Sequence, residues 1–275
     1  MSETIFALSS GSPPAAIAVI RISGQNAETA LVALTGGLPK PRLASYRTVR
    51  DGSGEILDRA LTLWFPGPAT ATGEDLAEVH LHGGRAVVAA VESALGAMAG
   101  LRRATPGEFT RRAFTNGRID LAEAEGLADL LAAETELQRK SAVAMAGGAL
   151  SREVVGWRED LLRASAAVEA VLDFADEDDV ATLPDAFAQD LTRLRQAISL
   201  WLDRPSARLL REGFRVVLAG PPNSGKSTLF NALVDSDAAI TASVAGTTRD
   251  VLSRPVALSG VPFSKKKSTT TDWRA

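Results

Sequence analysis

The residues best suited to chemistry in this chain form a glycine-rich loop. Every fixed position of the pattern Gly-x4-Gly-Lys-Ser/Thr is filled by Gly220-Pro221-Pro222-Asn223-Ser224-Gly225-Lys226-Ser227. In such a loop the backbone amides face nucleotide phosphates, and the amino end of the following helix adds positive potential. Lys226 is expected to reach the β- and γ-phosphates, and the Ser227 hydroxyl to bind Mg²⁺. The sequence therefore predicts a nucleoside triphosphate site.

A strand and a helix must flank this loop, and the sequence supplies both. The apolar run 214–219 predicts a buried strand, and residues 228–233 continue as a helix. Further along, Ala245-Gly246-Thr247-Thr248-Arg249-Asp250 is a polar segment with two hydroxyls. It lies where a switch segment can fold over the γ-phosphate and Mg²⁺. The loop alone does not choose between GTP and ATP.

The amino-terminal part has the pattern of a mixed α/β domain. Short β-like runs at 16–22, 47–50 and 57–65 are separated by glycine and proline turns. One helix is expected to start after Ser23, which would cap it, and a second is expected from Arg85 to Met98.

Turn-forming residues become rarer beyond Asp120, where long packed helices are expected. Proline is absent from 121 to 183, and apolar residues recur at helical spacing. These residues are Leu150, Val154, Trp157, Leu161, Val168 and Leu172. An acidic stretch, 173–179, is interpreted as a solvated loop, and another amphipathic helix is expected from Phe187 to Trp201.

A second cluster of polar residues belongs to the amino-terminal part. Arg21 ends an apolar strand, where a charge must reach solvent or meet an acid. Glu78, His80 and His82 alternate along a strand-like run and would share one face. Two histidines without any cysteine argue against a metal site here.

Composition indicates a soluble globular protein of the cytoplasm. The chain has 275 residues, 45% hydrophobic and 23% charged, a length for about two domains. A net charge of −3 argues against a surface devoted to nucleic acid. The absence of cysteine excludes disulfides and thiolate zinc sites. There is no secretion signal at the amino end and no apolar run of ~18 residues, so no membrane anchor is expected.

Several short motifs, in the order in which they occur along the chain, resemble those of the MnmE/TrmE family of GTPases that modify the wobble uridine of tRNA. Besides the phosphate loop and Gly246-Thr247-Thr248-Arg249-Asp250, they include two groups of short motifs. The first group is Ala18-Val19-Ile20-Arg21-Ile22-Ser23-Gly24, Thr72-Gly73-Glu74-Asp75 and His82-Gly83-Gly84. The second is Pro106-Gly107-Glu108-Phe109-Thr110-Arg111-Arg112-Ala113-Phe114 and Asn116-Gly117-Arg118-Ile119-Asp120-Leu121-Ala122-Glu123-Ala124-Glu125.

This resemblance implies three parts and a set of partners. Residues 1–118 would form an α/β domain that dimerises and binds 5-formyl-tetrahydrofolate. Residues 119–212 would form the first part of an all-α domain, and 213–275 an incomplete P-loop α/β G domain. The resemblance also implies a homodimer, the flavoprotein partner MnmG, and tRNA bound through the complex. The implied reaction adds a carboxymethylaminomethyl group to the wobble uridine.

The resemblance also implies site residues. Arg21 and Glu78 stand where the family holds the folate, and Arg118 replaces a Lys used there, which keeps the charge but alters the geometry. Asn223 would bind K⁺, and Thr248 would join Ser227 on Mg²⁺. The implied nucleotide-binding set is Asn223, Ser224, Gly225, Lys226, Ser227, Thr228, Thr247 and Thr248.

The sequence also departs from the family. After Ser227 there is neither an Asp-x-x-Gly motif nor an Asn-Lys-x-Asp motif, and the family's terminal Cys-x-Gly-Lys is missing. From about 264 apolar periodicity stops, so a disordered tail is expected, as after a truncation or frame change within the G domain. We expect weak phosphate binding and no efficient hydrolysis by this chain.

Two other readings stay open. The chain could be a non-catalytic folate-binding dimerisation module whose nucleotide segment does not function. The second is an aminomethyl or formyl transferase similar to the glycine-cleavage T protein. It would share the type of folate-binding domain, but it would contain no phosphate loop.

Overall fold

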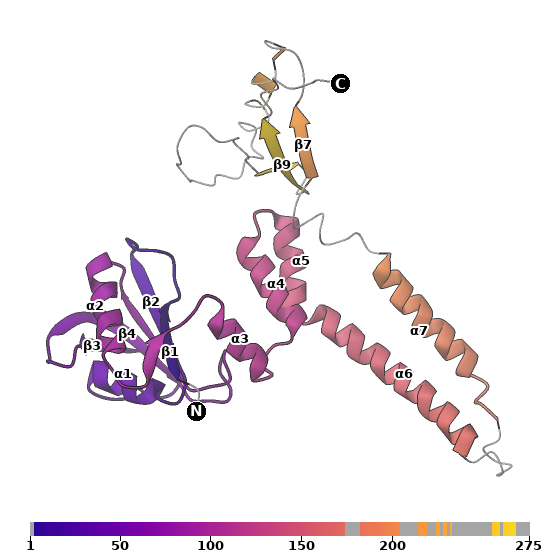
Figure 1. Cartoon of the computed structure of the whole chain (residues 1–275), viewed down its shortest axis with the longest axis horizontal. Helices are drawn as coiled ribbons and strands as arrows, with labels where there is room; N and C mark the ends of the chain where they lie inside the picture. The colour runs from indigo at the N-terminus through magenta and orange to yellow at the C-terminus, as the bar shows by residue number, and fades with distance from the viewer. Residues whose placement is uncertain are drawn as a thin grey trace. The chain divides into compact units, whose positions relative to one another are not determined.

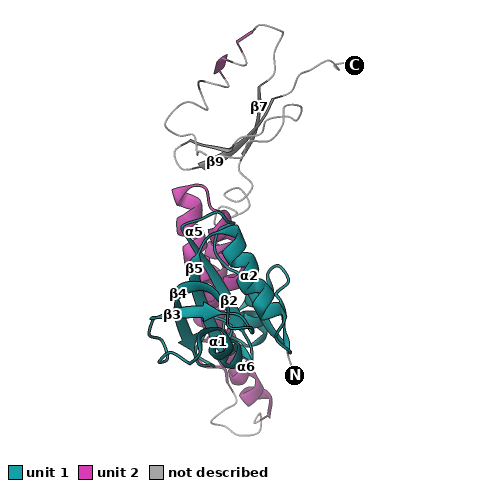
Figure 2. Cartoon of the chain, turned by 90° about the vertical axis from the view of Figure 1, so that its left-hand side faces the viewer, with its two compact units in different colours: residues 1–121 teal, residues 122–275 magenta. Residues whose placement is uncertain are grey.

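The computed structural model describes residues 3–173, 182–203, 214–218, 224, 225, 228, 229, 232, 255–258 and 261–267. Contacts between residues divide the chain into two compact units, Met1–Leu121 and Ala122–Ala275 (Figure 2).

The first unit is built on a six-stranded sheet with the strand order β3-β4-β5-β2-β1-β6 (Figure 1). The short β6 pairs in parallel with β1, and the other neighbouring strands pair antiparallel. The mixed α/β prediction is therefore confirmed. The strands are β1 (Thr4–Leu8), β2 (Ile17–Ser23), β3 (Ser45–Arg50), β4 (Ile56–Phe65), β5 (Leu76–His82) and β6 (Leu101–Arg103).

Two helices, α1 (Ala27–Thr35) and α2 (Arg85–Gly96), cover one face of this sheet and form the hydrophobic core with it. On β2 the residues facing these helices, including Ile20 and Ile22, are fully buried. Side chains alternate between faces along a strand, so their neighbours face the other way. We call the sheet surface opposite α1 and α2 the open face; near its β1 side lies α3 (Glu108–Thr115).

The start of α1 differs from the prediction. The helix begins at Ala27 with Asn26 at the cap position, so Ser23 does not cap it. Ser23 ends β2 instead, fully buried, and its hydroxyl forms hydrogen bonds with Thr72 and Glu74. The predicted start of α2 at Arg85 is confirmed.

The second unit begins with a close pair of helices, α4 (Leu121–Ala132) and α5 (Glu136–Ala146). A capping box opens α5, because Thr135 accepts from the Gln138 backbone and Gln138 accepts from the Thr135 backbone. Gly126 of α4 lies directly against α5. A Cβ added there would meet the backbone nitrogen of Ala146 at 2.4 Å, so only glycine allows this approach.

Two longer helices follow, α6 (Ala149–Asp173) and α7 (Phe187–Leu202). Both predicted helices are confirmed, and Trp157 meets Trp201 edge to face with ring centroids 6.1 Å apart. The predicted packing of these helices is confirmed by this contact, but no described residue of either helix is buried, and Leu172 is 72% exposed. Two helices alone cannot enclose both apolar stripes. None of the described helices has the length and apolarity needed to cross a bilayer.

A three-stranded sheet is formed by β7 (Phe214–Leu218), β8 (Pro255–Leu258) and β9 (Val261–Lys267) in the order β7-β9-β8. β9 is parallel to β7 and antiparallel to β8. The strand predicted before the phosphate loop is confirmed. The tail predicted to be disordered from about 264 is wrong for 264–267, because backbone pairing with β7 does not require apolar side chains. Residues 268–275 lie outside the described residues.

Gly126→Ala tests the close approach of α4 to α5. We expect a loss of about 1–3 kcal/mol of stability, because the added methyl group must push the helices apart. The control is Gly156→Ala in α6, where an added Cβ meets nothing within 4 Å. That change is expected to stabilise the chain by about 0.5–1 kcal/mol through helix propensity. Thermal unfolding followed by circular dichroism measures both, and equal effects would contradict the packing argument.

Candidate functional site

The most specific polar contact of the open face joins Arg21 of β2 to Glu78 of β5. The two residues are directly opposite in the strand register. Nε and Nη2 of Arg21 both donate to Oε1 of Glu78, at 3.0 and 2.7 Å. Their side chains are 31% and 16% exposed. Arg21 lies within β2, two residues before its end, and it meets an acid, the second of the two outcomes expected from the sequence.

His80, two residues along β5, bonds to the other oxygen of the same carboxylate. Its Nε2 lies 3.2 Å from Oε2 of Glu78. Burial raises the pKa of Glu78, but hydrogen bonds from Arg21 and His80 outweigh it, so the pKa lies below its usual value. The ionised carboxylate only accepts hydrogen bonds, so Nε2 of His80 is assigned as the donor.

Apolar and aromatic side chains flank these three polar groups. In the register of the sheet, Leu61 and Val19 lie on either side of His80, and Leu63 lies beside Glu78. The Arg21 guanidinium lies over the ring of Phe109 from α3, 5.9 Å from its centroid. A few convergent polar groups beside apolar and aromatic side chains are typical of the composition of small-molecule sites.

His82 is on the same strand face but has a different partner. Its backbone N–H donates to Oδ2 of Asp58, and its Nδ1 lies 2.8 Å from Oδ1. Its side chain is 74% exposed. The alternation of Glu78, His80 and His82 is confirmed, and the two histidines serve separate carboxylates. No group of three or more side chains suited to a metal ion was found among the described residues.

Arg118 is anchored to the segment that precedes β5. Its Nε donates to the Thr70 carbonyl at 3.2 Å, and Asn116 donates to the Thr72 carbonyl at 2.7 Å. Gly73, with φ of +79°, permits this contact, because a Cβ there would meet Cγ of Arg118 at 3.1 Å. Hydrogen bonds therefore tie Arg118 to Thr70 and join Arg21 to Glu78, and none within the described part of the chain links Arg118 to that pair.

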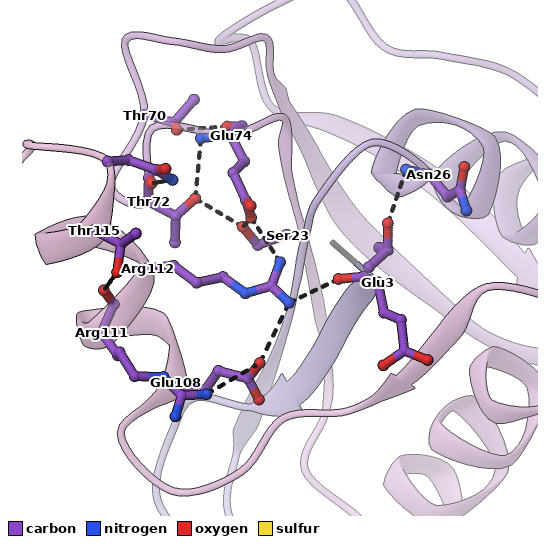
Figure 3. A network of polar contacts seen from close by, with 12 residues as sticks. Glu3, Ser23, Asn26, Thr70, Thr72, Glu74, Glu108, Arg111, Arg112 and Thr115 are labelled. Carbon is purple, nitrogen blue, oxygen red and sulfur yellow. Dashed lines mark hydrogen bonds and ion pairs between the residues drawn. The ribbon is translucent and has the colours of Figure 1, made fainter. Parts of the chain in front are cut away.

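A polar network that sequence reasoning did not assign holds α3 to the end of β2 (Figure 3). Arg112 donates to Glu74 at 2.9 Å, to the Glu3 carbonyl at 2.7 Å and to Glu108 at 3.3 Å. Ser23 donates to the same Glu74 carboxylate at 2.8 Å. The spacing of Glu108 and Arg112, four residues apart, was the available signal in the sequence.

Glu108 is the most deeply buried acid in this network, with a side chain 2% exposed. Arg102 donates to both of its oxygens, at 2.8 and 2.6 Å, and the Thr105 backbone donates at 2.9 Å. The hydrogen bonds from Arg102 hold the pKa of Glu108 far below its usual value, against the opposing effect of burial. The carboxylate is therefore ionised in the folded state at neutral pH.

The phosphate loop is described only in part. Gly225 has φ of +81°, and its carbonyl accepts from the Leu229 backbone at 2.8 Å, the first bond of a helix. Ser224 and Thr228 are also described, whereas Asn223, Lys226, Ser227, Thr247 and Thr248 lie outside the described residues. The nucleotide and metal contacts of these residues stay predictions.

Together these features define a multidomain protein with a sheet domain, a helical region and a strand that precedes a glycine-rich loop. Two family models match the chain: "GTP-binding protein TrmE N-terminus" over residues 4–118 and "MnmE helical domain" over residues 121–271. The second match covers more than half of the chain, so the chain belongs to the MnmE family.

Similar curated proteins carry the name "tRNA modification GTPase MnmE". That of Novosphingobium aromaticivorans is 65% identical over 274 residues, which covers 96% of this chain and 63% of the relative. That of Erythrobacter litoralis is 65% identical over 262 residues, 95% of this chain and 62% of the relative. That of Rhizorhabdus wittichii is 60% identical over 265 residues, which covers 95% of this chain and 60% of the relative. The chain thus spans less than two thirds of the length of these relatives.

Glu108→Gln tests the network. At pH 7 we expect a loss of about 2–4 kcal/mol, because Arg102 and Arg112 each lose one charged partner, and that partner is buried. Since the folded-state pKa of Glu108 is depressed, its stabilisation is present above the unfolded value of about 4.3 and is lost as pH falls below it. Thermal unfolding from pH 7 to pH 3 should show the variant and the wild type converging. Glu136→Gln removes an exposed ion pair and serves as the control with little change.

Proposed function

We propose that this chain serves the carboxymethylaminomethyl modification of the tRNA wobble uridine, together with the flavoprotein partner MnmG. In this proposal the first unit binds 5-formyl-tetrahydrofolate as one-carbon donor, and the loop at 220–228 binds GTP. The observation that carries the proposal is the Arg21–Glu78 pair on the open face, opposite in register and hydrogen-bonded.

The chemistry of this pair suits a folate. A pterin ring is planar, with ring and amino N–H groups that a carboxylate accepts, and the glutamate tail is anionic. Arg21 uses two of its five N–H donors on Glu78, so three remain for a ligand. The ring of Phe109 and the apolar residues Val19, Leu61 and Leu63 offer the flat apolar surroundings that a heteroaromatic ring requires.

Arg118 is the third proposed folate contact. Its Nε is engaged by the Thr70 carbonyl, which leaves the terminal nitrogens of an exposed guanidinium for an anionic group. The 70–73 segment would then position this charge. An Arg is suited to this double task, because a Lys in its place has a single nitrogen for both partners.

For the nucleotide we propose the contacts that the phosphate loop implies. Lys226 would bind the β- and γ-phosphates, Ser227 and Thr248 would bind Mg²⁺, and Asn223 would bind K⁺, with Thr247 beside the nucleotide. Support comes from β7, which leads directly into the loop, and from the left-handed backbone of Gly225. The β7-β9-β8 order places a parallel neighbour beside the loop strand, as nucleotide-binding sheets require.

We also propose a cytoplasmic homodimer formed through the first unit. Its open face exposes large apolar side chains: Ile17 at 60%, Tyr46 at 67% and Leu61 at 45%. Such a surface is typical of a contact between proteins. The family match over residues 4–118 supports the dimer.

Hydrolysis by a polypeptide of these 275 residues is proposed to be weak. After Ser227 the sequence contains no Asp-x-x-Gly motif to sense the γ-phosphate and no Asn-Lys-x-Asp motif to read guanine. The alternative function is a non-catalytic folate-binding dimerisation module, and the exposed open face of the first unit favours it equally. Potassium-dependent GTP hydrolysis in a turnover assay would exclude this alternative.

Arg21→Ala is expected to weaken binding of 5-formyl-tetrahydrofolate by about 10- to 100-fold, because the ligand loses charged donors and Glu78 loses its partner. Isothermal titration of the full chain measures the affinity. The matched control is Arg50→Ala at the edge strand β3, whose Nη1 donates to the Gly54 carbonyl. Unchanged folate affinity in Arg21→Ala would contradict the proposed site.

Lys226→Ala is expected to abolish binding of Mg²⁺-GTP while folate affinity stays within about twofold of the wild type. The reason is that this lysine is the cation of the phosphate loop, and it plays no part in the proposed folate site. Titration with GTP and Mg²⁺ in potassium buffer measures it. Equal nucleotide affinity in the variant and the wild type would exclude the loop as the nucleotide site.

A further inference from the structure

We propose that His80 is a positioning residue of the ligand site on the open face, acting on the ligand through Glu78. The inference rests on the proposed folate function of that site. His80 lies on the same strand face as Glu78, two residues along β5.

The first step is that the two oxygens of Glu78 have different partners. Oε1 receives both hydrogen bonds from Arg21, and Oε2 lies 3.2 Å from Nε2 of His80. The terminal torsion of a glutamate is intrinsically broad, so a carboxylate held at one oxygen can turn. Partners at both oxygens fix its plane.

The second step is that the orientation of Glu78 sets the orientation of Arg21. The pair is held through Nε and Nη2, the side edge of the guanidinium. This leaves Nη1 free to face a ligand. If the Glu78 carboxylate turned, the Arg21 guanidinium would lose its fixed partner. The Arg21 side chain would then regain rotamer freedom, and ligand binding would have to remove that freedom at a cost in affinity.

The third step is that His80, which holds Oε2 of Glu78, is part of a strand rather than of a loop. It lies two residues from Glu78 on β5, between Leu61 and Val19 in the register, with a side chain 31% exposed. The apolar neighbours limit where the ring can go. The imidazole therefore holds Oε2 from a rigid element.

His82 provides a matched control from the same strand. The chain has two histidines, and His82 bonds to Asp58 rather than to Glu78. A change at His82 thus removes the same type of ring, two residues away, without touching the Glu78 carboxylate.

The test is isothermal titration of the full chain with 5-formyl-tetrahydrofolate, using His80→Leu, His80→Gln and His82→Leu, each also in a Glu78→Gln background. We expect His80→Leu to weaken binding by about 5- to 30-fold, the loss of one indirect charged hydrogen bond. His80→Gln keeps an N–H donor and should recover most of the affinity. His82→Leu should change it by less than about twofold.

The Glu78→Gln background separates positioning from direct contact. If His80 acts through Glu78, His80→Leu should have little further effect there. An equal loss in both backgrounds would mean that His80 contacts the ligand itself, and would overturn the inference. So would unchanged affinity of His80→Leu, or failure of His80→Gln to recover what His80→Leu loses.

Failure of the inference can be told apart from failure of the proposed function. A wild-type chain that binds no folate, while thermal unfolding shows it folded, overturns the proposed function and this inference with it. A wild-type chain that binds folate, with no coupling between positions 78 and 80, overturns the inference alone.

Discussion

The register between β2 and β5 is the constraint on which the rest of the first unit depends. It sets Arg21 opposite Glu78 and Ile20 opposite Val79. Because side chains alternate, a shift of β2 by one residue would turn Arg21 toward the core and Ile20 toward the open face, and it would separate Arg21 from Glu78. The seven paired positions from Ile17 to Ser23 thus fix the core and the candidate site together.

The charged network around Glu108 extends this constraint to segments outside the sheet. Arg112 connects α3 to Glu74 and to the backbone of Glu3, and Ser23 connects the end of β2 to the same Glu74. Phe109 of α3 is thereby held over Arg21. A buried ionic network has a high desolvation cost, so its value here is the fixed geometry that it gives to the wall of the site.

Much of this fold could be predicted from local patterns. Short β-like runs between turn residues indicated β2, β3 and β4, alternation indicated β5, and helical spacing indicated α2, α6 and α7. The role of Ser23 could not, because its partner Thr72 is 49 residues away and a local pattern favours a cap. The strand at 264–267 was missed because backbone pairing leaves no trace in side-chain polarity. Arg21 was predicted to meet either an acid or solvent. Only the register between β2 and β5 shows that it meets Glu78.

The charges of the candidate site argue for a division of labour among its basic residues. Arg21 and Glu78 neutralise each other, so in our proposal this pair orients a ligand without supplying net attraction. An anionic tail needs a further positive charge, and Arg118 supplies it in our proposal, held by Thr70 through a nitrogen that a Lys lacks. The replacement of Lys by Arg is then compatible with binding, because the guanidinium can be anchored and still face the ligand. In our proposal the Arg21–Glu78 pair of the sheet thus orients the ligand, and Arg118, which is held by the 70–73 segment, attracts its anionic tail.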